Sequence, residues 1–177
     1  MDKWEAIYKR ETERGLTEKS AVNEKAFIDF IRSLKLGKET VVEVGTYKGL
    51  SAAFFATEAA RVITFDIKDF SKQQGWIWHK AGLLGRIEFH QNKNVTDIKN
   101  ALKGQKFSFA FIDGVIPAEE LERVFYAVKK AGRVLIHNAK DTPKYADTME
   151  FINKVLKTDY RRIGDHSVYW EKKGWRR

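Results

Sequence analysis

The amino-acid sequence predicts an α/β fold, in which helices cover both faces of a mostly parallel sheet of seven strands. Short apolar runs rich in β-branched residues alternate with helical patterns, which is typical of crossover units in a parallel sheet. The last two runs are separated only by residues 164–166, so they can pair as an antiparallel hairpin. The 177 residues suit a single domain, 1–177, with a helical extension at 1–36 and a core at 38–177.

Two helices are expected in the N-terminal extension, because apolar residues recur at helical spacing in two stretches. Their predicted ranges are 3–14 and about 18–34. Gly15 is expected to end the first helix, and Thr17 or Ser20 to cap the second.

The core begins with a β-branched strand at 41–44, after which Gly45 permits a tight turn with positive φ. An alanine-rich helix is expected over about 50–58. The further strands are expected at 61–66, 86–90, 107–112, 133–136, 160–163 and 167–170. The further helices are expected around 74–83, from after Asn94 to near Gly104, from Pro117 to before Gly132, and from Pro143 to about 157.

Composition excludes several classes of protein. Hydrophobic residues make up 43% of the chain, as in a globular protein and unlike a disordered one. No apolar run is long enough to span a membrane, and the charged N-terminus has no apolar signal core, so neither membrane insertion nor secretion is expected. Cysteine is absent, which excludes disulfides and Cys-ligated metals and fits a cytoplasmic location. The net charge of +9 is either spread over a solvated surface or attracts polyanions such as RNA.

Small or polar residues follow five of the predicted strands. Ligands of open α/β sheets bind beyond the carboxyl ends of the strands, so these residues predict a ligand site. They are Gly45 and Gly49 after the first strand, Asp66 after the second, Asn92 and Asn94 after the third, Asp113 and Gly114 after the fourth, and His137 and Asn138 after the fifth.

The expected ligand is a nucleoside with a small charged tail. Asp66 ends the second strand after a glycine turn, where a carboxylate can accept hydrogen bonds from both hydroxyls of a ribose. The stretch from Gly45 to Gly49 lacks the middle glycine of the dinucleotide fingerprint, and the sequence contains no phosphate-binding Gly-Lys-Ser/Thr motif. Tyr47 also leaves little room for a pyrophosphate against the backbone.

The stretch Val-Glu-Val-Gly-Thr-Tyr-Lys-Gly-Leu-Ser at 42–51 resembles the first motif of class I S-adenosylmethionine-dependent methyltransferases. It is most similar to the branch of small O-methyltransferases. Phe-Asp-Ile at 65–67 and Phe-Ile-Asp-Gly at 111–114 look like shorter motifs of the same family, and the resemblance covers about 41–138. It implies a Rossmann-like fold, an enzyme, and S-adenosylmethionine as cofactor.

The resemblance implies roles for matching positions. Glu43 and Gly45 would contact the amino-acid part of the cofactor, Asp66 its ribose, and Asn92 or Asn94 its adenine. Asp113 would lie beneath the sulfonium and the substrate. The cofactor-binding residues expected in this way are Glu43, Gly45, Thr46, Tyr47, Gly49, Ser51, Asp66, Asn92, Asn94 and Asp113. Carboxylates among them suit a cofactor that carries a positive sulfonium and a positive amine.

Asp113 and His137 are the expected catalytic residues, with or without a metal. Some members of this branch hold a divalent ion with an Asp after the fourth strand and an Asp-Asn pair after the fifth. Asp113, His137 and Asn138 occupy these positions, so a Mg²⁺ or Mn²⁺ site is one expectation, although the imidazole favours softer ions than Mg²⁺. Without a metal, His137 is the best candidate for a general base.

The expected reaction is methyl transfer to the oxygen of a small molecule. The charge of +9 favours RNA as an alternative acceptor, and a non-catalytic nucleoside-binding protein is a second alternative. Acceptor choice is expected to reside in the N-terminal helices and in residues 67–85, where Trp76 and Trp78 either wall a pocket or pack inside the protein. The N-terminal helices could also form a lid or a contact between two copies in a homodimer.

Overall fold

The computed structural model describes residues 2–15 and 21–174. Its sheet contains seven strands in the order β3-β2-β1-β4-β5-β7-β6. The strands are β1 (Thr40–Val44), β2 (Arg61–Asp66), β3 (Ile87–Gln91), β4 (Phe109–Ile112), β5 (Arg133–Ile136), β6 (Arg161–Ile163) and β7 (Ser167–Glu171). Strands β1 to β5 are parallel, whereas β7 is antiparallel to both of its neighbours. The predicted sheet and its closing hairpin are thus confirmed.

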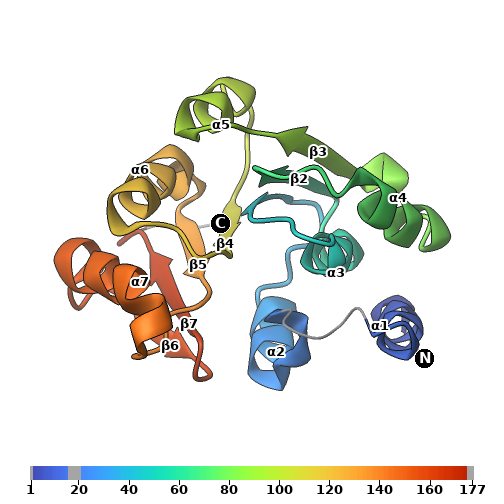
Figure 1. Ribbon diagram of the computed structural model, residues 1–177, viewed down its shortest axis with the longest axis horizontal. Helices are drawn as coiled ribbons and strands as arrows, with labels where there is room; N and C mark the ends of the chain where they lie inside the picture. The colour runs from blue at the N-terminus through green and yellow to red at the C-terminus, as the bar shows by residue number, and fades with distance from the viewer. Residues whose placement is uncertain (1, 16–20, 175–177) are drawn as a thin grey trace.

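Helices form one layer on each face of the sheet (Figure 1). The first layer consists of α1 (Lys3–Glu13), α2 (Lys25–Ser33), α3 (Leu50–Glu58) and α4 (Ser71–Lys80). The second consists of α5 (Val95–Ala101), α6 (Ala118–Val128) and α7 (Ala146–Phe151). Because successive side chains of a strand point to opposite faces, Val41 joins the core under the first layer and Val42 the core under the second.

Helix α3 is buried on almost every side, from Leu50 to Ala56. This explains its alanine-rich, uniformly apolar sequence, since a helix that is hydrophobic all round belongs inside a protein. Its N-terminus follows Gly49 directly, so the glycine turn after β1 is attached to a rigid central element.

The predicted helix at 18–34 is wrong in one respect. Residues Ala21–Asn23 form a 3₁₀ turn, and α2 begins only at Lys25. Glu24 between them is extended, with φ −92° and ψ 114°, and its side chain does not cap the helix. The predicted caps Thr17 and Ser20 lie outside the described residues.

Several other predicted bounds shift. The helix expected around 74–83 begins at Ser71 and ends at Lys80, and a 3₁₀ turn, Leu84–Arg86, precedes β3. The helix expected from Pro143 to 157 is composite, with a 3₁₀ turn at Pro143–Tyr145, α7, and a π-helical segment at Ile152–Leu156. Hydrophobic periodicity identifies such segments but does not distinguish these helix types.

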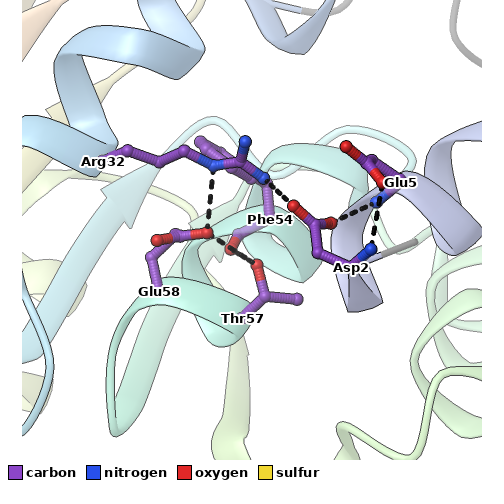
Figure 2. Close-up of polar contacts among 6 residues, drawn as sticks. All are labelled: Asp2, Glu5, Arg32, Phe54, Thr57 and Glu58. Carbon is purple, nitrogen blue, oxygen red and sulfur yellow. Dashed lines mark hydrogen bonds and ion pairs between the residues drawn. The ribbon is translucent and has the colours of Figure 1, made fainter.

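Helix α1 is held to the first layer by both apolar and charged contacts. Trp4 is only 3% exposed, and its ring centroid lies 4.9 Å from that of Phe54 in α3. Figure 2 shows Arg32 of α2 between Asp2, at 2.6 Å, and Glu58 of α3, at 3.5 Å. The N-terminal extension therefore packs on the core in the structure.

Among the described residues, no helix is both long enough and apolar enough to cross a membrane. The cytoplasmic location remains a prediction.

Candidate functional site

A cavity of about 770 Å³ opens at the carboxyl ends of the parallel strands. Residues from the ends of β1, β2, β4 and β5 line it, together with residues from the start of α2 and the turn between β6 and β7. Of the predicted site residues, those that line the cavity are Gly45, Tyr47, Asp66, Asn92, Asp113, His137 and Asn138. Glu43, Thr46, Gly49, Ser51 and Asn94 are not among the lining residues, and their positions are described below.

The turn after β1 requires glycine at two positions. Gly45 has φ +102°, and a Cβ there would lie 1.5 Å from the carbonyl oxygen of Asp113. Gly49 has φ +81°, and a Cβ there would lie 2.8 Å from the ring of Trp78. The Trp78 indole donates a hydrogen bond to the Gly49 carbonyl at 2.9 Å. The turn is thus held against both β4 and α4 by close backbone packing.

Asp66 lies on the cavity wall with its carboxylate partly engaged. Its Oδ2 accepts a hydrogen bond from the backbone N–H of Tyr47 at 2.7 Å, and its Oδ1 accepts one from Lys68 N at 2.9 Å. Each carboxylate oxygen can accept more than one hydrogen bond. Asp66 therefore braces the glycine turn and retains acceptor capacity toward the cavity.

Glu43 is fully buried beside the glycine turn. Burial raises the pKa of its carboxyl from 4.5 to about 8, although the hydroxyls of Ser51 and Thr64 oppose this shift. Thr64 donates to Oε2, and Thr46 shares a hydrogen bond with Thr64 at 2.5 Å. Within the described part of the chain, Oε1 of Glu43 has no hydrogen-bond partner. Thr46 and Ser51 therefore lie around the buried carboxyl of Glu43 and do not line the cavity.

The two asparagines after β3 have different positions. Asn94 caps α5, since its side chain accepts hydrogen bonds from Thr96 N and Asp97 N. Asn92 is 6% exposed and lines the cavity, and its Oδ1 has no hydrogen-bond partner among the described residues. Asn92 is therefore the asparagine that is free to meet a ligand.

Asp113 and Asn138 meet across the ends of β4 and β5. The Asn138 amide donates to Asp113 Oδ1 at 2.8 Å. The pKa of Asp113 is raised to about 7, chiefly by burial and in a smaller part by the charge of Glu24, while the hydrogen bond from Asn138 lowers it. The metal site expected at Asp113, His137 and Asn138 does not fit this arrangement. The atom of Asn138 that faces Asp113 is the amide nitrogen, which donates hydrogen bonds and does not ligate metals.

His137 is directed away from this pair by its own contacts. Its Nδ1 lies 3.0 Å from the hydroxyl of buried Ser167, and its Nε2 lies 3.7 Å from Oε1 of Glu24. The same Glu24 oxygen lies 2.7 Å from Nδ1 of His166. Burial lowers the pKa of His137 to about 4, with a further contribution from His166. A base this weak is poorly matched to neutral pH, so the lowered pKa argues against His137 as a general base.

The sequence predicts no role for Glu24, and it places His166 in the closing hairpin turn, either on the surface or at the rim of the site. Glu24 fell inside a predicted helix, and only the break before α2 exposes it. His166 reaches the cavity because the hairpin turn packs against the start of α2, where a Cβ on Gly164 would lie 3.1 Å from Cβ of Ala26. No local pattern signals either contact.

The two tryptophans of α4 do not line the cavity. Trp78 supports the glycine turn, and the guanidinium of Arg14 lies 3.5 Å from the centroid of the Trp76 ring. Of the side chains that the structure describes at 67–85, Ile67 alone borders the cavity. Lys144 and Tyr145, before α7, also line it and were not predicted.

This strand order, with a ligand cavity at the strand ends above a glycine turn, defines a Rossmann-like fold of the class I methyltransferase type. A family profile described as "Methyltransferase domain" matches residues 42–139, more than half of the chain. The chain belongs to this methyltransferase family, and the resemblance inferred from the sequence is confirmed.

Solved structures share the fold at low sequence identity. Cofactor-bound Rv0187 from MTB superposes with a TM-score of 0.72 and 16% identity, covering 94% of this chain and 88% of its own. The O-methyltransferase TomG from Streptomyces achromogenes, solved with SAM, superposes with a TM-score of 0.69 and 16% identity, covering 97% of this chain and 90% of its own. An O-methyltransferase from Bacillus cereus, solved with SAH, superposes with a TM-score of 0.69 and 15% identity, covering 97% of this chain and 92% of its own. No curated protein matches the chain in sequence.

Proposed function

We propose that the protein is an S-adenosylmethionine-dependent methyltransferase that acts on an oxygen atom of a small molecule. The observation that carries this proposal is the cavity of about 770 Å³, which Gly45, Asp66, Asn92 and Asp113 line at the strand ends. Its volume is within the range of cavities that enclose small ligands. Membership of the methyltransferase family and the fold shared with two SAM- or SAH-bound O-methyltransferases support the same reading.

The residues present fit the cofactor in two ways. Two buried polar atoms have no partner among the described residues, Oδ1 of Asn92, which lines the cavity, and Oε1 of Glu43, on the strand that leads into the glycine turn. Such atoms are rare unless a ligand or water completes them. The lining is also acidic, since the described lining residues include a single lysine, Lys144, and four acids, Glu24, Asp66, Asp113 and Glu120. Both features suit a nucleoside that carries positive charge.

Each residue then has a distinct task. Asp66 would accept hydrogen bonds from the ribose and Asn92 from the adenine amino group, while Glu43 would influence the cationic tail from beneath the turn. Gly45 and Gly49 allow the backbone to approach, and Tyr47 covers the nucleoside side. Bound S-adenosylmethionine supplies an electrophilic methyl group. Asp113 and His137 lie toward the acceptor, so catalysis would rest mainly on positioning the two reactants.

Isothermal titration calorimetry with S-adenosylmethionine and S-adenosylhomocysteine tests the proposal. The protein should bind both, and Asp66→Ala should lose affinity because the ribose loses its acceptor. Asp69→Ala is the matched control, since Asp69 is exposed and does not line the cavity. Failure of the unmodified protein to bind either ligand would remove the proposed function, and unchanged affinity in Asp66→Ala would remove the ribose assignment.

The net charge of +9 keeps an RNA acceptor as the second candidate. RNA binding that falls steeply as salt is added would support it, because released counterions make such binding salt-dependent. Absence of RNA binding even at low salt would eliminate it. Cofactor binding without transfer to any oxygen acceptor would instead favour a non-catalytic nucleoside-binding protein.

A further inference from the structure

Three potential metal ligands meet at one end of the cavity. They come from Glu24, His137 and His166, each of which offers one ligand atom, and these atoms all lie within 4.8 Å of one another. All three residues line the cavity. Glu24 and His166 lie outside residues 42–139, so the family match does not account for two of the three.

The order of the strands places this group on the acceptor side. Asp66 and Asn92 follow β2 and β3, Asp113 follows β4 in the middle of the sheet, and His137 follows β5. His166 precedes β7, which is the next strand outward. Because neighbouring strands are about 4.8 Å apart, the cluster is separated from the nucleoside residues by the width of several strands.

The three ligands are held by ordered contacts. Ser167 binds Nδ1 of His137 and so directs Nε2 toward Glu24. The His166 carbonyl accepts a hydrogen bond from Ala139 N at 2.8 Å, which joins the hairpin turn to the segment after β5. The Ser167 hydroxyl is a partner of the kind that orients an imidazole ligand in a metal site, whereas the backbone bond fixes the position of the turn that carries His166.

The spacing suits a small divalent ion. Ligands at 2.0–2.1 Å in a tetrahedral site are about 3.3 Å apart. Glu24 Oε1 lies 2.7 Å from His166 Nδ1 and 3.7 Å from His137 Nε2, on either side of that value. The 3.7 Å contact is longer than a hydrogen bond, so Glu24 and His137 are close without being directly bonded.

We propose that Glu24, His137 and His166 form a site for a divalent transition metal, of which Zn²⁺ is the best fit, open toward the cavity. Two imidazoles and one carboxylate favour Zn²⁺ over Mg²⁺, and three protein ligands leave a position for an exogenous oxygen. Resting on the proposed function, this open position would take an oxygen of the methyl acceptor. The acceptor class is then a hydroxyl compound able to ligate a metal.

The alternative to a metal site is a simple ion pair between Glu24 and protonated His166. The chain supplies a matched comparison, because His90 also contacts a glutamate, Glu88, at 2.6 Å. Among the described residues no second histidine joins that pair, and Arg61 occupies the other oxygen of Glu88. It should therefore not bind a metal.

Metal titration of the chelator-treated protein tests the site. We expect one tight Zn²⁺ per chain by competition with a chromogenic chelator, and visible absorption bands on adding Co²⁺. Glu24→Gln and His166→Gln should each weaken Zn²⁺ binding by about 100-fold or more, beyond the usual effect of outer-shell changes. His90→Gln should leave it unchanged. Both ligand variants replace partly exposed residues, and circular dichroism would verify that they fold.

Two results would overturn the proposal: no Zn²⁺ or Co²⁺ binding by the unmodified protein, or equal binding in His166→Gln and His90→Gln. The open position has its own readout, since acetohydroxamate, an oxygen chelator, should change the Co²⁺ spectrum, and an unchanged spectrum would remove the acceptor role. Cofactor calorimetry is independent of these measurements, so failure of the metal site and failure of methyltransferase function are distinguishable.

Discussion

Glu43 and Asn92 show that buried polar groups indicate a ligand site more specifically than exposed ones do. Each has a side-chain oxygen without a hydrogen-bond partner among the described residues. Such an atom typically lowers stability by about 1–3 kcal/mol, so its retention calls for an explanation. The proposed nucleoside ligand would supply a partner to Asn92 and would lie next to the turn that follows Glu43.

Replacing Glu43 by Gln should flatten the dependence of stability on pH. The folded-state pKa of about 8 exceeds the ordinary 4.5, so the folded protein binds the proton more tightly, and the associated stability is lost as pH rises through 8. Between about pH 5 and pH 9, the free energy of unfolding of Glu43→Gln should fall by roughly 2–4 kcal/mol less than that of the unmodified protein. Urea unfolding at each pH measures this difference.

Glu88→Gln is the control for this measurement. The pKa of Glu88 is lowered, chiefly by its hydrogen bond from Arg61, so its contribution is lost as pH falls and not as it rises. An identical pH slope in Glu43→Gln and the unmodified protein would contradict the assignment of the raised pKa to Glu43.

The glycine turn after β1 depends on backbone packing as much as on conformation. Gly45→Ala would combine a strained φ of +102° with a Cβ 1.5 Å from the Asp113 carbonyl oxygen, so β1 and β4 would have to separate at the site. We expect a loss of stability of about 3 kcal/mol or more, together with loss of cofactor binding. Thermal unfolding and calorimetry measure the two effects.

Gly75→Ala is the matched substitution for that experiment. Gly75 lies inside α4, its φ is not positive, and nothing lies within 4 Å of a Cβ placed there. Alanine should therefore stabilise the protein by about 0.5–1 kcal/mol through helix propensity. Equal destabilisation by the two substitutions would mean that the close approach at Gly45 is not the cause.

Docking of α1 should depend on apolar burial more than on the charged contacts of Figure 2. Trp4→Ala should destabilise the protein by about 3–5 kcal/mol, because Trp4 is 3% exposed against Phe54. Arg32→Ala should cost less than about 1 kcal/mol, since its ion pairs with Asp2 and Glu58 are partly exposed. Chemical unfolding measures both, and a reversed order would contradict this account.

Charge is distributed unevenly over the protein. The chain carries a net +9, yet acidic residues exceed basic ones among the described residues that line the cavity. The basic surplus therefore lies outside the cavity, where it raises solubility or attracts polyanions. The cavity itself is suited to a cation.

S-adenosylhomocysteine, the product formed from the cofactor, should raise the free energy of unfolding of the whole protein. At 100 times its Kd, S-adenosylhomocysteine would add about 2.7 kcal/mol, which raises Tm by roughly 5–10 °C for a chain of this size. Differential scanning calorimetry measures the shift, which should shrink in Asp66→Asn and persist in Asp69→Asn. A shift of equal size in both variants would contradict the placement of the ligand beside Asp66.

The strands, the glycine turn and the positions of Asp66, Asn92 and Asp113 followed from the sequence, because hydrophobic periodicity is local and parallel strands bring their carboxyl ends to one edge. The burial of Glu43 did not, since it depends on neighbours in space. The capping box of Asn94 and Asp97 is a local pattern, and the prediction of Asn94 as a ligand-binding residue overlooked it. The meeting of Glu24, His137 and His166 required the tertiary structure. Glu24 and His166 are 142 positions apart in the sequence, and the packing of the hairpin turn against the start of α2 brings them together.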